Sequence, residues 1–71
     1  MLLLTQGREI INLDRMAIID TSSFNIYARQ GMGDRGIVLG GYDSESRCHE
    51  IIGSIFDDYC CDERIFKMPE E

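Results

Sequence analysis

Residues 31 to 36, GMGDRG, have the G-x-G-x-x-G spacing with which dinucleotide-binding folds hold a pyrophosphate. That chemistry requires a helix directly after the glycines, because the free N–H groups at the helix N-terminus bind the phosphates. The next residues are instead Ile37-Val38-Leu39-Gly40-Gly41. A β-branched run favours a strand, and each glycine destabilises a helix by about 1 kcal/mol relative to alanine. We therefore predict a hairpin loop here and no nucleotide cofactor.

The pairs Cys48-His49 and Cys60-Cys61 contain side chains that zinc prefers as ligands. On one continuous helix, however, Cys48 and Cys60 are about 18 Å apart, whereas the ligands of one tetrahedral ion lie within about 4 Å of each other. This geometry excludes a zinc site within one chain and leaves open only a metal shared between two subunits. Adjacent helical residues diverge by about 100°, so Cys48 and His49 do not form a nucleophile and base pair.

The acidic pairs Asp57-Asp58 and Asp62-Glu63 lack the spaced oxygen ligands of a calcium loop and are typical of the solvated side of a helix. His49-Glu50 begins an H-E-x-x-H zinc motif, but the fifth position is Gly53 and the chain has 1 histidine. The sequence therefore predicts no catalytic set, no metal site and no cofactor. We expect that the protein is not an enzyme.

The elements that carry these residues are predicted from hydrophobic periodicity. Short apolar or alternating runs are separated by turns that contain Gly, Asn, Asp or Ser. These runs predict strands at about residues 2–5, 9–13, 16–21, 24–30 and 36–40. A parallel neighbour needs a crossover of about a dozen residues or more, so connections as short as these predict an antiparallel meander.

After Tyr42 the apolar residues no longer recur at the spacing of a strand, about every second residue, but at that of a helix, about every 3.6 residues. Ser44 or Asp43 can accept a hydrogen bond from a free N–H of a following helix, and Glu45 favours its first turn. From there a helix is predicted over about residues 44–63, before Pro69 forbids continuation. Its apolar residues form one broad stripe of Cys48, Ile51, Ile52, Ile55, Phe56 and Tyr59. The predicted fold class is α+β, an antiparallel meander of about five strands packed by one C-terminal α-helix in a single domain, 1–71.

Charge and composition limit the partners. Seven basic and thirteen acidic residues give a formal net charge of −6, which repels the phosphates of a nucleic acid, so no direct nucleic-acid partner is expected. No apolar stretch is long enough to span a membrane, and the run Met1–Leu4 is too short for a signal peptide. Three cysteines, of which Cys60 and Cys61 are adjacent, predict free thiols. We expect a cytoplasmic protein without a membrane partner.

Two segments resemble a group of very short uncharacterised proteins from Gram-positive bacteria and their phages or mobile elements. They are NLD at Asn12–Asp14 and LGGYDSE at Leu39–Glu45, and the resemblance covers nearly the whole chain. In outline the chain is also similar to a reduced pleckstrin-homology-like domain. The resemblance implies a strand meander closed by one helix, and binding rather than catalysis. The chain lacks the basic loop of a phosphoinositide-binding member, so lipid-headgroup binding is not implied.

A sheet covered on one face by one helix leaves its other face bare, and a contiguous apolar surface of that kind marks an interface. We therefore expect a small non-catalytic protein-interaction or assembly module that binds a protein partner or itself, as a closed two-fold homodimer. The expected core consists of Leu3, Ile11, Leu13, Ile18, Phe24, Ile26, Leu39, Ile52, Ile55 and Tyr59. The expected interface consists of Ile10, Ala17, Ile19, Tyr27, Val38, Ile65, Phe66 and Met68.

An alternative function uses the acidic residues of the helix. In this alternative the chain is a small acidic inhibitor or regulator that occupies a basic site on a larger partner protein. The residues of its acidic patch are Glu45, Glu50, Asp57, Asp58, Asp62 and Glu63. Binding of this kind accelerates at low salt and weakens as ionic strength rises, whereas apolar assembly does not.

Overall fold

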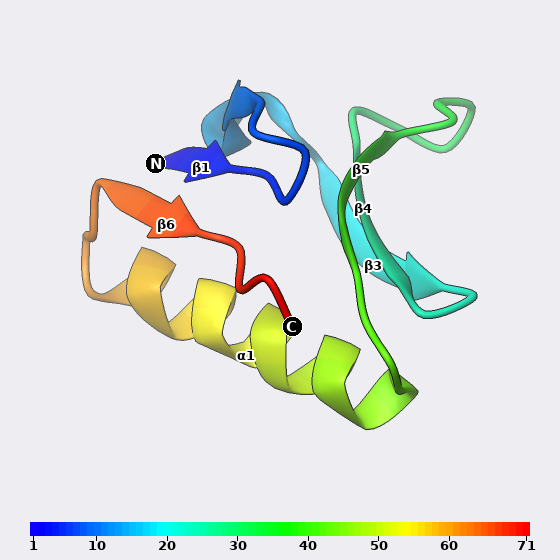
Figure 1. Cartoon of the computed structure of the whole chain (residues 1–71). Helices are drawn as coiled ribbons and strands as arrows, with labels where there is room; N and C mark the ends of the chain where they lie inside the picture. The colour runs from blue at the N-terminus through cyan, green and yellow to red at the C-terminus, as the bar shows by residue number, and fades with distance from the viewer.

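A computed structural model describes residues 1–71, which form six strands, one short 3-10 turn and one long helix (Figure 1). In chain order the elements are β1 (Leu2–Leu4), β2 (Ile10–Asn12), η1 (Leu13–Arg15), β3 (Ile18–Ser22), β4 (Asn25–Arg29), β5 (Ile37–Gly41), α1 (Glu45–Cys60) and β6 (Ile65–Lys67). Each of the five predicted strands overlaps one of the first five observed strands. The α+β fold class is confirmed.

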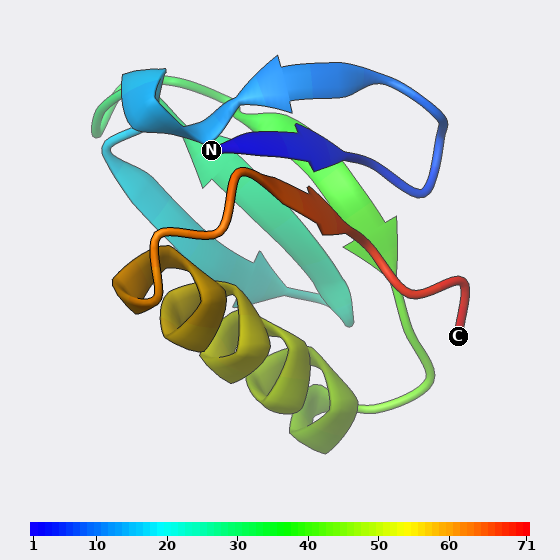
Figure 2. The ribbon, with the colours of Figure 1, turned by 90° about the vertical axis from the view of Figure 1, so that its left-hand side faces the viewer.

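The strands form two three-stranded sheets, ordered β2-β1-β6 and β3-β4-β5. The second sheet is an antiparallel meander. In the first sheet β1 pairs antiparallel with β2 and parallel with β6, which places Leu3 opposite Phe66. Figure 2 shows α1 lying across one face of the β3-β4-β5 sheet, with the β2-β1-β6 sheet above it. The core therefore lies between two sheets and one helix.

The strand β6 has no counterpart among the predicted elements. The helix was predicted to run to about residue 63, with no further strand after it, but α1 ends at Cys60. Asp62 adopts a left-handed backbone conformation with φ 59°, which turns the chain away from the helix. The next residues alternate between exposed and buried, as expected for a strand.

The start of α1 follows the predicted capping chemistry. Ser44 is extended, and its hydroxyl accepts a hydrogen bond from the Arg47 amide at 3.1 Å. Behind this cap Cys48, Ile51 and Ile55 are buried, at the spacing of one helical face. The helix is thereby anchored by one narrow buried stripe, whereas the predicted apolar stripe was wider.

The core also differs from its prediction. Phe24 and Tyr59 are 49% and 50% exposed, and Ile18 is half-buried rather than buried. Phe24 follows Ser23 in the β3–β4 turn, where both residues have positive φ, as in a type I′ hairpin turn whose side chains point to solvent. Ile11 and Ile52 are half-buried against the core. The buried cluster itself contains Leu3, Leu13, Ile26, Ala28, Leu39, Tyr42, Cys48, Ile51, Ile55, Phe66 and Met68.

Candidate functional site

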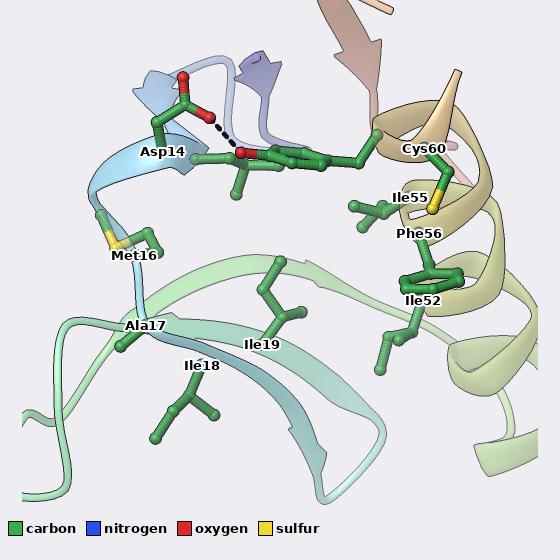
Figure 3. A pocket seen from close by; sticks show the side chains of 11 residues that line it. Asp14, Met16, Ala17, Ile18, Ile19, Ile52, Ile55, Phe56 and Cys60 are labelled. Carbon is green, nitrogen blue, oxygen red and sulfur yellow. Dashed lines mark hydrogen bonds between the residues drawn. The ribbon is translucent and has the colours of Figure 1, made fainter. Parts of the chain in front are cut away.

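A groove of about 370 Å³ lies between the start of β3 and the C-terminal half of α1 (Figure 3). Ten of its eleven lining residues are hydrophobic. Met16, Ala17 and Ile19 line it from the strand side, and Ile52, Phe56 and Tyr59 line it from the helix side. The groove is a concave apolar surface of the size that binds ligands and side chains.

The groove is open because the apolar stripe of α1 is wider than the surface that covers it. Ile52, Phe56 and Tyr59 recur at helical spacing beside the buried stripe that holds the helix on the core. Ile52 is half-buried, while Phe56 is 67% exposed and Tyr59 is 50% exposed. Two aromatic rings at the outer side of the groove are therefore partly in water.

A polar contact closes one end of the groove. The Tyr59 hydroxyl donates a hydrogen bond to Asp14 Oδ1 at 2.6 Å, drawn as the dashed line in Figure 3. Asp14 Oδ2 also accepts from the amino group of Met1 at 3.2 Å. The Tyr59 hydrogen bond, followed by the ammonium group, holds the pKa of Asp14 below its ordinary value. The same hydrogen bond raises the pKa of Tyr59.

Beyond this contact lies a second cavity of about 640 Å³, which shares Asp14 and Tyr59 with the groove as lining residues. Met1, Asp62, Glu63 and Arg64 also line it, so three carboxylates lie with two cations, the Arg64 guanidinium and the Met1 ammonium that is paired with Asp14. None of the ion pairs in the molecule involves Asp62, Glu63 or Arg64. The apolar groove thus continues into an acidic cavity.

The strand beside the groove has a free edge. β3 is the outermost strand of its sheet, and no backbone hydrogen bond outside the sheet involves Ile18–Ser22. Ile18 and Ile19 point to opposite faces of the strand, and both line the groove (Figure 3). The groove therefore includes the edge of β3 that lies between these two side chains. An unpaired edge of this kind is a template for another strand.

The predicted interface residues do not form one surface. Ile10 and Ile65 are 70% and 61% exposed, but they lie on the β2-β1-β6 sheet. Tyr27 and Val38 are paired on the other sheet, on its outer face. The prediction placed residues of two different sheets on one face, because a short strand's periodicity does not indicate the sheet to which it belongs.

The other four predicted interface residues differ in whether they line the groove or are buried in the core. Ala17 is exposed and lines the groove. Ile19 also lines the groove, but it faces α1, because it pairs with the buried Ala28 on the core side of the sheet. Phe66 and Met68 are buried, at 8% and 6% exposure, and belong to the core. These last two side chains are therefore not available to a partner.

The residues singled out for chemistry are dispersed. Cys48 is buried while His49 is exposed, so the two side chains do not meet. No group of three or more His, Cys, Asp or Glu residues is arranged to hold a metal ion. The GMGDRG stretch is the loop between β4 and β5, as predicted, where the Asp34 carboxylate accepts from the amides of Gln30 and Gly36.

The residues that form the groove were only partly found from the sequence. Phe56 and Tyr59 were placed on the apolar stripe, and both were expected to cover the sheet. The signal was the width of that stripe, which exceeds what one sheet face covers. Asp14 and Met16 carried no signal, because their part in the groove depends on where η1 packs against α1.

No family model, no curated protein and no solved structure matches this chain. The resemblance to short proteins of Gram-positive bacteria and their mobile elements therefore stays a prediction. The single long helix of the chain is not long and apolar enough to cross a membrane.

Proposed function

We propose that the protein is a non-catalytic interaction module that binds a segment of another protein in the groove between β3 and α1. The observation that carries the proposal is the groove itself, which is concave, almost entirely apolar and open to solvent at Phe56 and Tyr59. Aromatic side chains at a partly exposed apolar surface are the usual anchors of protein interfaces.

Burial of a partner's aromatic side chain in the groove would contribute substantially to the free energy of binding. An aromatic side chain buries about 150–250 Å², which at about 25 cal/mol per Å² corresponds to about 4–6 kcal/mol before the cost of association. The scattered exposed residues Leu2, Ile10 and Ile65 lie on a sheet face and offer only a smaller hollow of about 170 Å³. The groove is therefore the surface that we assign to binding.

A second copy of this chain is the competing occupant, since a homodimer was expected from the sequence. Each copy carries a formal net charge of −6, so association brings like charges together. Another protein without this charge does not meet that repulsion. We therefore favour a different protein in the groove.

The acidic inhibitor is the second candidate function. It is supported by exposed carboxylates on α1 and just after it, among which Asp57, Asp62 and Glu63 are in no ion pair. Glu45 and Glu50, by contrast, are near His49 at 3.5 Å and Arg47 at 3.9 Å. Binding through this patch would depend on salt and would be insensitive to a change in the groove.

For either function we propose the cytoplasm as the location, because a reducing compartment fits the free cysteines of the chain. Its three cysteines are free, and Cys60 and Cys61 are exposed. Exposed thiols persist where the environment keeps them reduced.

Selection of random peptides on the immobilised protein tests the groove. The test variant is Phe56→Gln, and its matched control is Ile10→Gln, because the two side chains are 67% and 70% exposed. Both substitutions keep the net charge. Enriched peptides should lose binding to Phe56→Gln by about tenfold or more and should bind Ile10→Gln as they bind the original protein. Equal binding to all three proteins would contradict the proposal.

A further inference from the structure

We infer that the occupant of the groove is an extended segment of another protein that pairs with the free edge of β3, buries an apolar side chain in the groove and places a lysine or arginine in the acidic cavity. This inference rests on the proposed function and specifies its ligand. Three independent features of the site support it.

The first feature is the backbone of β3. Its outer edge is unpaired along Ile18–Ser22, and the start of this edge, at Ile18 and Ile19, forms part of the groove. A segment in extended conformation satisfies such an edge with main-chain hydrogen bonds, whereas a helix has no free backbone groups to offer along its length. The edge therefore favours a strand as the bound form.

The second feature is the apolar wall that stands over this edge. Ile52, Phe56 and Tyr59 of α1 line the groove opposite Ile19 of β3. In an extended segment every second side chain points to the same face, so alternate residues would point at this wall. The segment should therefore carry an apolar residue that fits between Ile19 and Phe56.

The third feature is the charge at the end of the groove. The groove and the acidic cavity share Asp14 and Tyr59, so one ligand can extend from the first into the second. Asp62 and Glu63 are exposed and form no ion pair, whereas Asp14 is already paired with the Met1 ammonium, so Asp62 and Glu63 are the carboxylates available to a ligand. A basic side chain within about two to four residues of the apolar anchor would reach these carboxylates.

Charge complementarity also argues against a second copy as the occupant. Another copy would bring a formal net charge of −6 to a site where Asp62 and Glu63 are carboxylates without an ion pair. Its own segment Ile65–Lys67, which joins apolar residues to a lysine, is β6 and is paired with β1.

The probe for the test is the most enriched peptide from the random selection, labelled with a fluorophore and measured by anisotropy. We expect its sequence to combine an apolar residue with a nearby lysine or arginine. The double variant Asp62→Asn, Glu63→Gln should weaken binding about three- to tenfold at low salt. The matched control is Glu70→Gln, Glu71→Gln, which removes two exposed carboxylates outside the cavity and should change binding less than twofold.

Two measurements test the bound conformation. Hydrogen exchange of those Ile18–Ser22 amides that point away from β4 should slow by about tenfold or more when the peptide is bound. Methylation of the peptide's backbone amides should abolish binding at alternate positions and leave it nearly unchanged at the positions between them.

The outcomes separate the inference from the proposed function. If no peptide depends on Phe56, the proposed function itself is wrong. If binding depends on Phe56 but not on the carboxylates, or if backbone methylation has no alternating effect, the function stands and the inference is overturned. A dimer of the original protein that Phe56→Gln converts to a monomer would assign the groove to a second copy and overturn the inference as well.

Discussion

The two ends of α1 differ in how neighbouring segments of the same chain cover them. At the N-terminal end, the C-terminal residues are held by three side chains, those of Gln6, Tyr42 and Arg47. Tyr42 donates to the carbonyl of Pro69 at 2.6 Å, and Arg47 donates twice to the carbonyl of Glu71, at 3.1 and 2.8 Å. At the C-terminal end, only the hydrogen bond from Tyr59 to Asp14 spans the surface. One end is closed by polar contacts, and the other is left open and apolar.

Gln6 is the centre of the closed end. Its side-chain amide accepts from the amide of Gly41 at 2.9 Å and donates to the carbonyls of Gly41, Pro69 and Glu70 at 2.9–3.1 Å. A single side chain thereby joins the end of β1, the end of β5 and the C-terminal residues. The open end has no such residue, and its aromatic rings are exposed to solvent. The comparison is consistent with a stabilising role for the closed end and with the binding that we propose for the open end.

The largest expected effect on stability is a difference between two adjacent residues of α1, Ile55 and Phe56. Ile55 is 4% exposed and belongs to the core, whereas Phe56 is 67% exposed in the groove. Ile55→Ala should lower the free energy of unfolding by about 2–5 kcal/mol, a large part of the stability of so small a domain. Phe56→Ala should lower it by no more than about 1 kcal/mol. Urea denaturation measures both, and equal losses would contradict the difference in burial.

The next effect concerns the closed end. Gln6→Ala removes the partner of one amide and three carbonyl groups, and we expect a loss of about 1–3 kcal/mol. Gln30→Ala is the control, because the Gln30 side chain is exposed and makes no hydrogen bond. Denaturation of the two variants gives the difference. If Gln6→Ala is as stable as Gln30→Ala, the C-terminal residues are not held in the way described.

The smallest effect is the pH dependence of the open end. The Tyr59 hydrogen bond lowers the pKa of Asp14 from 3.8, so its contribution to stability is present above pH 3.8 and is lost as the pH falls through the lower folded value. The same bond raises the pKa of Tyr59 from 10.0, so that contribution is present below pH 10.0 and is lost as the pH rises through the higher folded value.

Tyr59→Phe tests both limits. The difference in unfolding free energy between the original protein and this variant should be largest near neutral pH and should shrink at either extreme. Tyr27→Phe is the control, because the Tyr27 hydroxyl makes no hydrogen bond and the ring lies at 5.0 Å from Arg29 on the outer sheet face. A pH-independent difference for Tyr59→Phe would show that the hydrogen bond to Asp14 does not contribute.

Several elements could be predicted because their signals are local. In β4, Ile26 and Ala28 are buried, whereas Tyr27 and Arg29 on the other face are only half-buried, as the alternation of residue types indicates. The cap at Ser44 was predicted from the chemistry of a free N–H group, and the hydrogen bond is present. The interface was predicted less well, since Ile10 and Val38 lie on different sheets.

The sequence by itself determined where strands and turns occur, where the helix begins and which residues alternate, because these depend on neighbours within a few positions. Only the tertiary structure decided that Ile65–Lys67 pairs with Leu2–Leu4, across nearly the whole chain, and that the strands divide into two sheets. It also decided which part of the apolar stripe stays uncovered. Periodicity identifies the apolar side of an element, but which other element packs on that side depends on long-range packing, and in this protein that packing leaves Phe56 and Tyr59 exposed to solvent.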